Sequence, residues 1–148
     1  MSEYRATTLW TRTSSDFTYD SYNRGHEVRT GGGQIIPWSS APEYKGERER
    51  VNPEEALVAA LSTCHMLTFL AIAARKQFTV DHYRDEAVGI MTKNDHGKFW
   101  VSQVTLRPEI VFGGTRQPSL QELAGMHHSA HENCFIANSV KTSVVIEG

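Results

Sequence analysis

Cysteine is scarce in this chain: only Cys64 and Cys134 occur among its 148 residues. Neither sign of charge dominates, since the net charge is -2, which gives no reason to expect a nucleic-acid or anionic-membrane partner. The start, residues 1–5, lacks the charged-then-apolar pattern of a signal peptide, and no apolar run is expected to approach the roughly 20 residues that cross a bilayer. We therefore expect a cytoplasmic protein, where two cysteines are more often catalytic, redox-active or metal-binding than a permanent disulfide.

The length and the hydrophobic pattern predict one α+β domain over residues 1–148. The sequence shows no internal repeats and no low-complexity segments. We expect a mostly antiparallel sheet with the first, long helix packed on it and buried. The expected strands span 4–11, 26–30, 34–38, 80–93, 98–112 and 140–147, and the expected helices span 52–76 and 119–132.

The first helix has a clear start and carries Cys64 near its middle. Asn52 is a good N-cap, Pro53 suits the first turn, and Glu55 stands at the capping-box position. A thiol inside so apolar a helix is either an inert core residue or a shielded nucleophile. Cys134 closes the second helix, and two thiols on two helices suggest a redox pair.

Three segments resemble the OsmC/Ohr family of thiol peroxidases. They are 52–64, which joins Asn-Pro-Glu-Glu to small and apolar residues and ends at Cys64; 134–140, which runs from Cys134 into a last strand; and Arg24-Gly25. The similarity covers essentially the whole chain. It implies that Cys64 reacts with peroxide, that Cys134 resolves the product and that Arg24 is the catalytic arginine. It also implies an OsmC/Ohr-like fold that forms an intertwined homodimer with two active sites at the subunit interface.

The chemistry of these residues fits such a reaction. A free thiol has a pKa of about 8.5, and apolar surroundings raise it, so a reactive Cys64 needs a nearby cation. Arg24 stays charged when desolvated and can stabilise the thiolate; Arg29, Arg48 and Arg50 are competitors for that role. Glu54 lies nearly three turns before Cys64 and cannot touch it, but the family resemblance implies that it holds the arginine.

The resemblance implies a full reaction cycle without flavin, haem or metal as cofactor. Cys64 would reduce an organic hydroperoxide or hydrogen peroxide and become a sulfenic acid, and Cys134 would convert this acid to a disulfide. An external dithiol, of a lipoyl type or a small-molecule thiol, would then reduce the disulfide.

Histidines support two alternatives from other classes. His127, His131 and Cys134 share one helix face at i, i+4 and i+7, a spacing that can bind zinc in a metal- or ligand-binding protein. His65 follows Cys64, where the family typically has a bulky apolar residue, and the two could form the base and nucleophile of a hydrolase. Neighbouring residues on a helix point about 100° apart, which is poor geometry for that pair.

Overall fold

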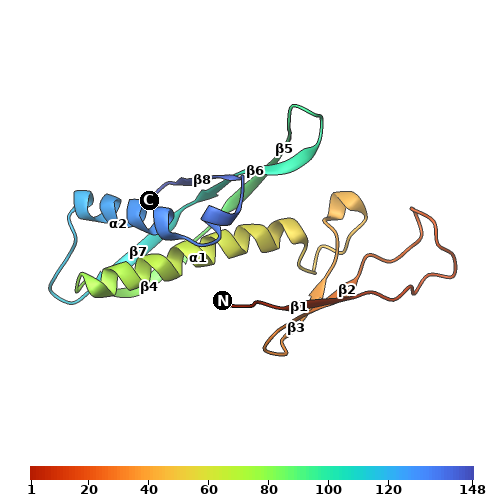
Figure 1. The fold of residues 1–148 in the computed structure, drawn as a ribbon, viewed down its shortest axis with the longest axis horizontal. Coiled ribbons are helices and arrows are strands. Elements are labelled where there is room, and N and C mark those ends of the chain that lie inside the picture. Colours follow the sequence, from red (N-terminus) through yellow and green to blue (C-terminus); the bar gives the residue numbers. More distant parts are fainter. The chain divides into compact units, whose positions relative to one another are not determined.

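The chain divides into two compact units, residues 1–56 and 57–148, in a computed structural model that describes all residues from 1 to 148. Figure 1 labels the helices and strands of both units. The mixture of two α-helices with predominantly antiparallel strands confirms the predicted α+β class. That one domain spans the whole chain stays a prediction.

Unit 1, residues 1–56, contains a three-stranded antiparallel sheet in the order β1-β2-β3. The strands are β1 (Ala6–Leu9), β2 (His26–Thr30) and β3 (Ile35–Trp38), so the three predicted strands are confirmed with shorter bounds. Pro37 lies on an outer strand, as expected of a residue that cannot donate a ladder hydrogen bond. A 3₁₀ turn, Pro42–Tyr44, follows the sheet.

The long helix α1 (Pro53–Arg75) begins where the sequence predicts. The Asn52 side-chain oxygen accepts a hydrogen bond from the Glu55 backbone N–H at 2.9 Å, and the Asn52 amide donates to the Glu55 carboxylate at 2.6 Å. This reciprocal arrangement satisfies a backbone donor of the first turn that has no partner inside the helix.

The two long strands predicted over 80–93 and 98–112 are each divided in two. The four strands are β4 (Thr79–Asp85), β5 (Val88–Lys93), β6 (Phe99–Leu106) and β7 (Pro108–Gly113); β4 pairs with β7, and β5 pairs with β6. At the junction the Asp85 carboxylate accepts the Arg107 backbone N–H at 2.6 Å and the Ser62 hydroxyl at 2.5 Å. The prediction of uninterrupted strands was wrong because a side chain, and not a neighbouring strand, satisfies the backbone at this point.

The last two elements are α2 (Leu120–Asn133) and β8 (Ser143–Ile146). Ser119 caps α2 in a full capping box with Glu122, as predicted. Strand β8 lies parallel to β6, with Val144 opposite Val104, whereas the other ladders are antiparallel.

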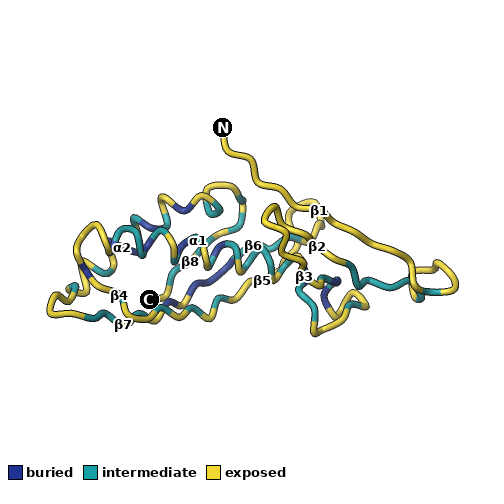
Figure 2. Tube along the Cα trace, turned by 90° about the horizontal axis from the view of Figure 1, so that it is seen from below, coloured by how far each residue is buried: buried dark blue, intermediate teal, exposed yellow.

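Unit 2, residues 57–148, has its own core between a helical layer and the strands (Figure 2). One cluster joins α1 and α2 to β4 and β7; its buried members are Phe69, Ala73, Phe78, Met126 and Ala130. A second cluster joins α1 to β6 through Leu61, Val104 and Leu106.

Helix α1 is covered along one stripe only within a single chain. Its buried residues recur every fourth position: Leu61, His65, Phe69 and Ala73. Leu67, on another side, is 59% exposed. By length and composition alone α1 is long and apolar enough to cross a membrane, so the expectation that no segment reaches this length does not hold. The core helix of a soluble protein can have the same length and composition.

Candidate active site

The structure brings the two thiols of unit 2 together. Cys64 lies in the middle of α1 and is partly exposed, whereas Cys134 caps the end of α2 and is 1% exposed. Both are free thiols, and their side chains lie close enough for each to shift the pKa of the other. The Ala137 backbone N–H also donates to the Cys134 sulfur, at 3.4 Å.

The surroundings of the two sulfurs drive their pKa values apart. Burial alone raises the pKa of Cys64, but hydrogen bonds from Cys134, from the backbone of Ile136 and Phe135 and from Thr68 outweigh it, so the pKa lies below its ordinary value. Burial and the neighbouring Cys64 raise the pKa of Cys134. Cys64 is therefore the sulfur disposed to be a thiolate, and Cys134 is the sulfur disposed to stay protonated.

Sequence reasoning missed the groups that stabilise the Cys64 thiolate from nearby. Thr68 lies one turn after Cys64, and its hydroxyl also donates to the Cys64 carbonyl at 2.8 Å. Residues four apart lie on the same face of a helix, so the sequence could have indicated that Thr68 is a neighbour of Cys64. The N–H groups of Phe135 and Ile136 are backbone donors, which no residue type reveals.

Cys64 faces a groove of about 740 Å³ between α1 and the end of α2. Besides Cys64, its apolar lining residues are Ala60, Leu67, Ala71, Ile72, Phe135 and Ile136. Its polar lining residues are Thr63, Thr68, Arg75, Ser129 and Asn133. Phe135 is 80% exposed. The groove can therefore hold an apolar molecule against the sulfur of Cys64.

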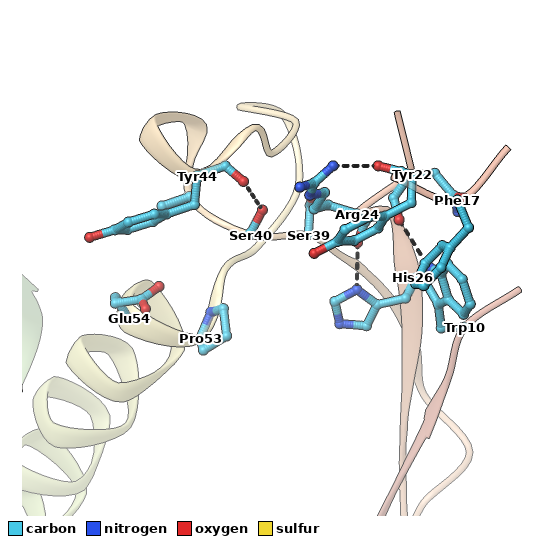
Figure 3. Close-up of a pocket in the computed structure, with 12 residues that line it drawn as sticks. Trp10, Phe17, Tyr22, Arg24, His26, Ser39, Ser40, Tyr44, Pro53 and Glu54 are labelled. Carbon is cyan, nitrogen blue, oxygen red and sulfur yellow. Dashed lines mark hydrogen bonds between the residues drawn. The ribbon is translucent and has the colours of Figure 1, made fainter. Parts of the chain in front are cut away.

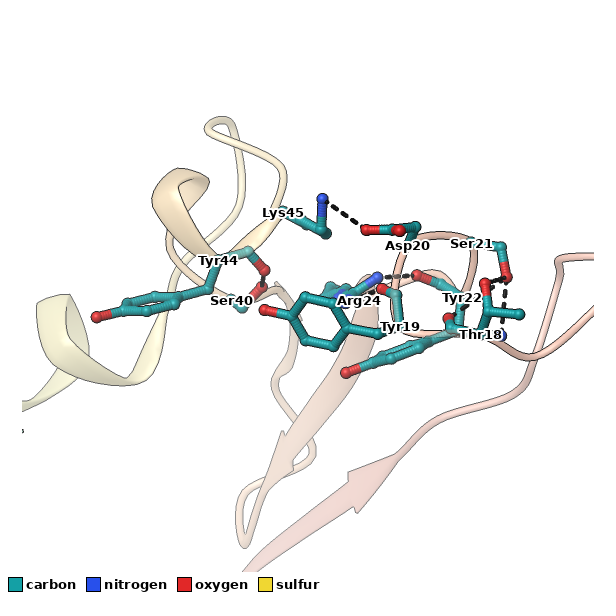
Figure 4. A network of polar contacts seen from close by, with 9 residues as sticks. All are labelled: Thr18, Tyr19, Asp20, Ser21, Tyr22, Arg24, Ser40, Tyr44 and Lys45. Atoms are coloured by element: carbon teal, nitrogen blue, oxygen red, sulfur yellow. Dashed lines mark hydrogen bonds and ion pairs between the residues drawn. The ribbon is translucent and has the colours of Figure 1, made fainter.

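Arg24 lies in unit 1, in the loop before β2. Its guanidinium donates to the carbonyls of Tyr22 and Tyr19, both at 2.5 Å, and lies 3.6 Å from the centre of the Tyr22 ring (Figure 4). An ion pair between Lys45 and Asp20, at 3.1 Å, ties the same loop to the turn after β3. The cation is thus held by local contacts, with donors of its fork still free.

Arg24 and Glu54 line one cavity of about 580 Å³ in unit 1 (Figure 3). They form no ion pair with each other, so the predicted role of Glu54 in holding Arg24 stays a prediction. Two competing arginines are engaged elsewhere: Arg29 pairs with Glu27 at 3.3 Å, and Arg50 pairs with Glu47 at 3.2 Å.

The histidines do not assemble the alternative sites. His65 lies in the buried stripe of α1, and its Nε2 is 3.0 Å from Nδ1 of His127, so its ring is turned to α2 and is not paired with Cys64. Burial lowers the pKa of His65 to about 4. No group of three or more His, Cys, Asp or Glu side chains is arranged to hold a metal ion.

Comparisons with known proteins identify the family and the fold of this chain. A family model described as OsmC, OsmC-like protein, matches residues 46–147. A Vibrio cholerae OsmC-like protein of unknown function is 51% identical and superposes with a TM-score of 0.96 over 99% of both chains. An uncharacterized Bacillus subtilis protein, YmaD, is 25% identical over 84% of each chain. The organic hydroperoxide resistance protein OhrB of Bacillus subtilis, 16% identical, shares the fold with a TM-score of 0.70 over 98% of this chain and 96% of its own.

Proposed function

Since this chain belongs to the OsmC-like protein family, we propose that it is a cysteine-based peroxidase that uses Cys64 as its nucleophile and Cys134 as its resolving thiol. What supports this most is the proximity of the two free thiols, which lowers the pKa of Cys64 and raises that of Cys134. A peroxidatic sulfur needs thiolate character, and a resolving sulfur needs to stay protonated and near.

The proposed cycle uses one peroxide and one dithiol. The Cys64 thiolate attacks one peroxide oxygen, the O–O bond breaks, and the leaving oxygen takes a proton and departs as an alcohol or as water. Cys64 is then a sulfenic acid. The Cys134 sulfur attacks it, the S–O bond breaks, water leaves, and a disulfide joins the two residues. An external dithiol, lipoyl-type or a small-molecule thiol, returns both cysteines to the reduced state by exchange.

The groove beside Cys64 favours an organic hydroperoxide as substrate. Its apolar lining can bury a hydrocarbon chain while the peroxide group meets the sulfur. A related fold is described as an organic hydroperoxide resistance protein, which is consistent with this class. Hydrogen peroxide has no apolar part to bury in the groove, so we expect it to be the poorer substrate.

Arg24 supplies the positive charge in this proposal. We propose that two chains form an intertwined homodimer in the cytoplasm and that Arg24 of one chain reaches the Cys64 thiolate of the other, with Glu54 orienting the arginine. A guanidinium held by local carbonyls keeps its charge and presents its remaining donors to the thiolate and to the peroxide oxygens. No further cofactor enters the cycle.

Three variants test the proposal in a peroxide-consumption assay. Cys64→Ser is expected to abolish turnover, because a serine hydroxyl cannot form a sulfenic acid. Cys134→Ser should consume about one equivalent and then stall as a sulfenic or overoxidised species. Ala59→Ser, which adds a hydroxyl to an exposed position of the same helix, is the matched control and should keep full turnover. Wild-type turnover in Cys64→Ser would contradict the mechanism.

A further inference from the structure

Two histidine rings meet inside unit 2, and neither of them lines the groove beside Cys64. His65 and His127 are 1% and 6% exposed. Their planes lie 9° apart, and His65 Nε2 is 3.0 Å from His127 Nδ1. Phe69 lies against the His127 ring, with 4.6 Å between ring centres. This is a buried hydrogen bond between α1 and α2, with Phe69 packed beside it.

The bond needs one imidazole to donate and the other to accept. Burial lowers the pKa of both residues, so both rings are neutral near pH 7 and share one proton across the contact. Other charged or titratable groups that act on His65 are His131 of α2 and Asp85 of β4. Either ring left without its partner would be a buried, unsatisfied polar group.

The pair is close in sequence to both thiols. His65 follows Cys64, and His127 precedes Cys134 by seven residues, which is two turns of helix. Moving the end of α2 away from α1 would therefore break the thiol contact and strain the imidazole contact together. A chain that keeps the hydrogen bond between the imidazoles therefore needs less free energy to bring the two sulfurs together.

We infer that His65 and His127 are positioning residues that hold the Cys134 thiol against Cys64 and so promote disulfide formation. Their role in turnover rests on the proposed function, in which the Cys134 proton leaves with the Cys64 hydroxyl as water. Their effect on the stability of the disulfide is independent of the proposed function, because any pair of thiols can be oxidised by exchange with another disulfide.

The decisive measurement is the equilibrium constant of the Cys64–Cys134 disulfide in buffers of reduced and oxidised glutathione. His127→Leu removes the bond, and the constant should fall about threefold to tenfold, the effect of losing one hydrogen bond. His127→Asn should restore it, because an Asn side-chain oxygen can take the place of Nδ1. His127→Gln places its polar group further out and should not restore it.

The same logic gives the mirror experiment on α1. His65 uses Nε2, the outer nitrogen, so His65→Gln should keep the constant and His65→Asn should lower it as His65→Leu does. Phe78→Leu is the control, because it weakens the same core cluster without touching the pair. Unchanged constants in both leucine variants, or an equal fall in Phe78→Leu, would overturn the inference.

A second arm separates this inference from the proposed function. Each variant is treated with excess cumene hydroperoxide, and the sulfinic form of Cys64 is measured by mass spectrometry. Loss of the pair should raise the ratio of sulfinic acid to disulfide about threefold to tenfold, since a slower Cys134 leaves the sulfenic acid exposed for longer. If peroxide leaves wild-type Cys64 unchanged while the glutathione result holds, the positioning role stands and the peroxidase function is rejected.

Discussion

The two units of the chain are built differently, and the difference assigns them different parts in the proposed chemistry. Unit 2 has two buried clusters and holds both thiols between packed helices. Unit 1 buries only Val28 and Ala41 among its hydrophobic residues, and its aromatic loop residues Phe17 and Tyr19 are 67% and 62% exposed. A unit with a packed core thus carries both sulfurs, whereas the arginine lies in a loop of a unit that has little core of its own.

The first way to test this contrast is the pH dependence of stability, which should come largely from unit 2. The pKa of buried His65 falls from 6.5 to about 4 on folding. Above pH 6.5 the His65 side chain is neutral in both the folded and the unfolded chain, so its titration does not change the free energy of unfolding. Between pH 6.5 and 4, His65 binds a proton in the unfolded chain but not in the folded chain. The free energy of unfolding therefore falls as the pH falls, by about 3 kcal/mol in total.

Urea unfolding of the wild type and of His65→Gln across this pH range checks the prediction. Glutamine does not titrate, so the variant should lose less stability on acidification. Identical slopes for the two proteins would show that other groups cause the pH dependence.

The second prediction concerns the contribution of unit 1 to catalysis. Arg24→Ala should lower kcat/KM about a hundredfold, the usual effect of removing one preorganised charge-stabilising donor, and should raise the pKa of Cys64. Arg24→Lys should recover activity only in part, because the planar fork is lost. Thiolate absorbance against pH gives the pKa, and Arg29→Ala, on an exposed ion pair, is the control. An unchanged titration in Arg24→Ala would transfer the role to another arginine.

The third prediction follows from the open faces of both units. If a second copy covers α1 and the aromatic loop, the dimer should bury well over 2,000 Å² in total, a size typical of obligate pairs. Each tenfold dilution should then lower the free energy of unfolding by about 1.4 kcal/mol, and light scattering at low micromolar concentration should give the mass of two chains. A stable monomer with full activity would contradict both the dimer and a shared active site.

Much of this arrangement was predictable from sequence because it depends on local signals. The caps at Asn52 and Ser119 mark where the helices begin, and the scarcity of cysteine directed attention to two thiols that the fold brings together. The break at Asp85 and the bond between His65 and His127 were not predicted. Both depend on residues 22 and 62 positions apart, and no local pattern reports such contacts.

The partial exposure of α1 in a single chain agrees with the sequence, because one sheet and one short second helix cannot easily cover a helix that is apolar on most sides. Apolar residues on most sides of a helix indicate that it will be covered, but not whether its own chain or another provides the cover. Leu67 and Phe135 are exposed in the single chain, and both line the groove that contains Cys64.

The central claim is that Cys64 and Cys134 form a peroxide-driven redox pair, and intact-mass spectrometry with thiol counting tests it most directly. One equivalent of cumene hydroperoxide should remove both free thiols and lower the mass of the chain by two hydrogen atoms. Cys134→Ser should instead gain oxygen on Cys64. A wild-type protein that keeps both thiols, or Cys64→Ser that still consumes peroxide at the wild-type rate, would contradict the account.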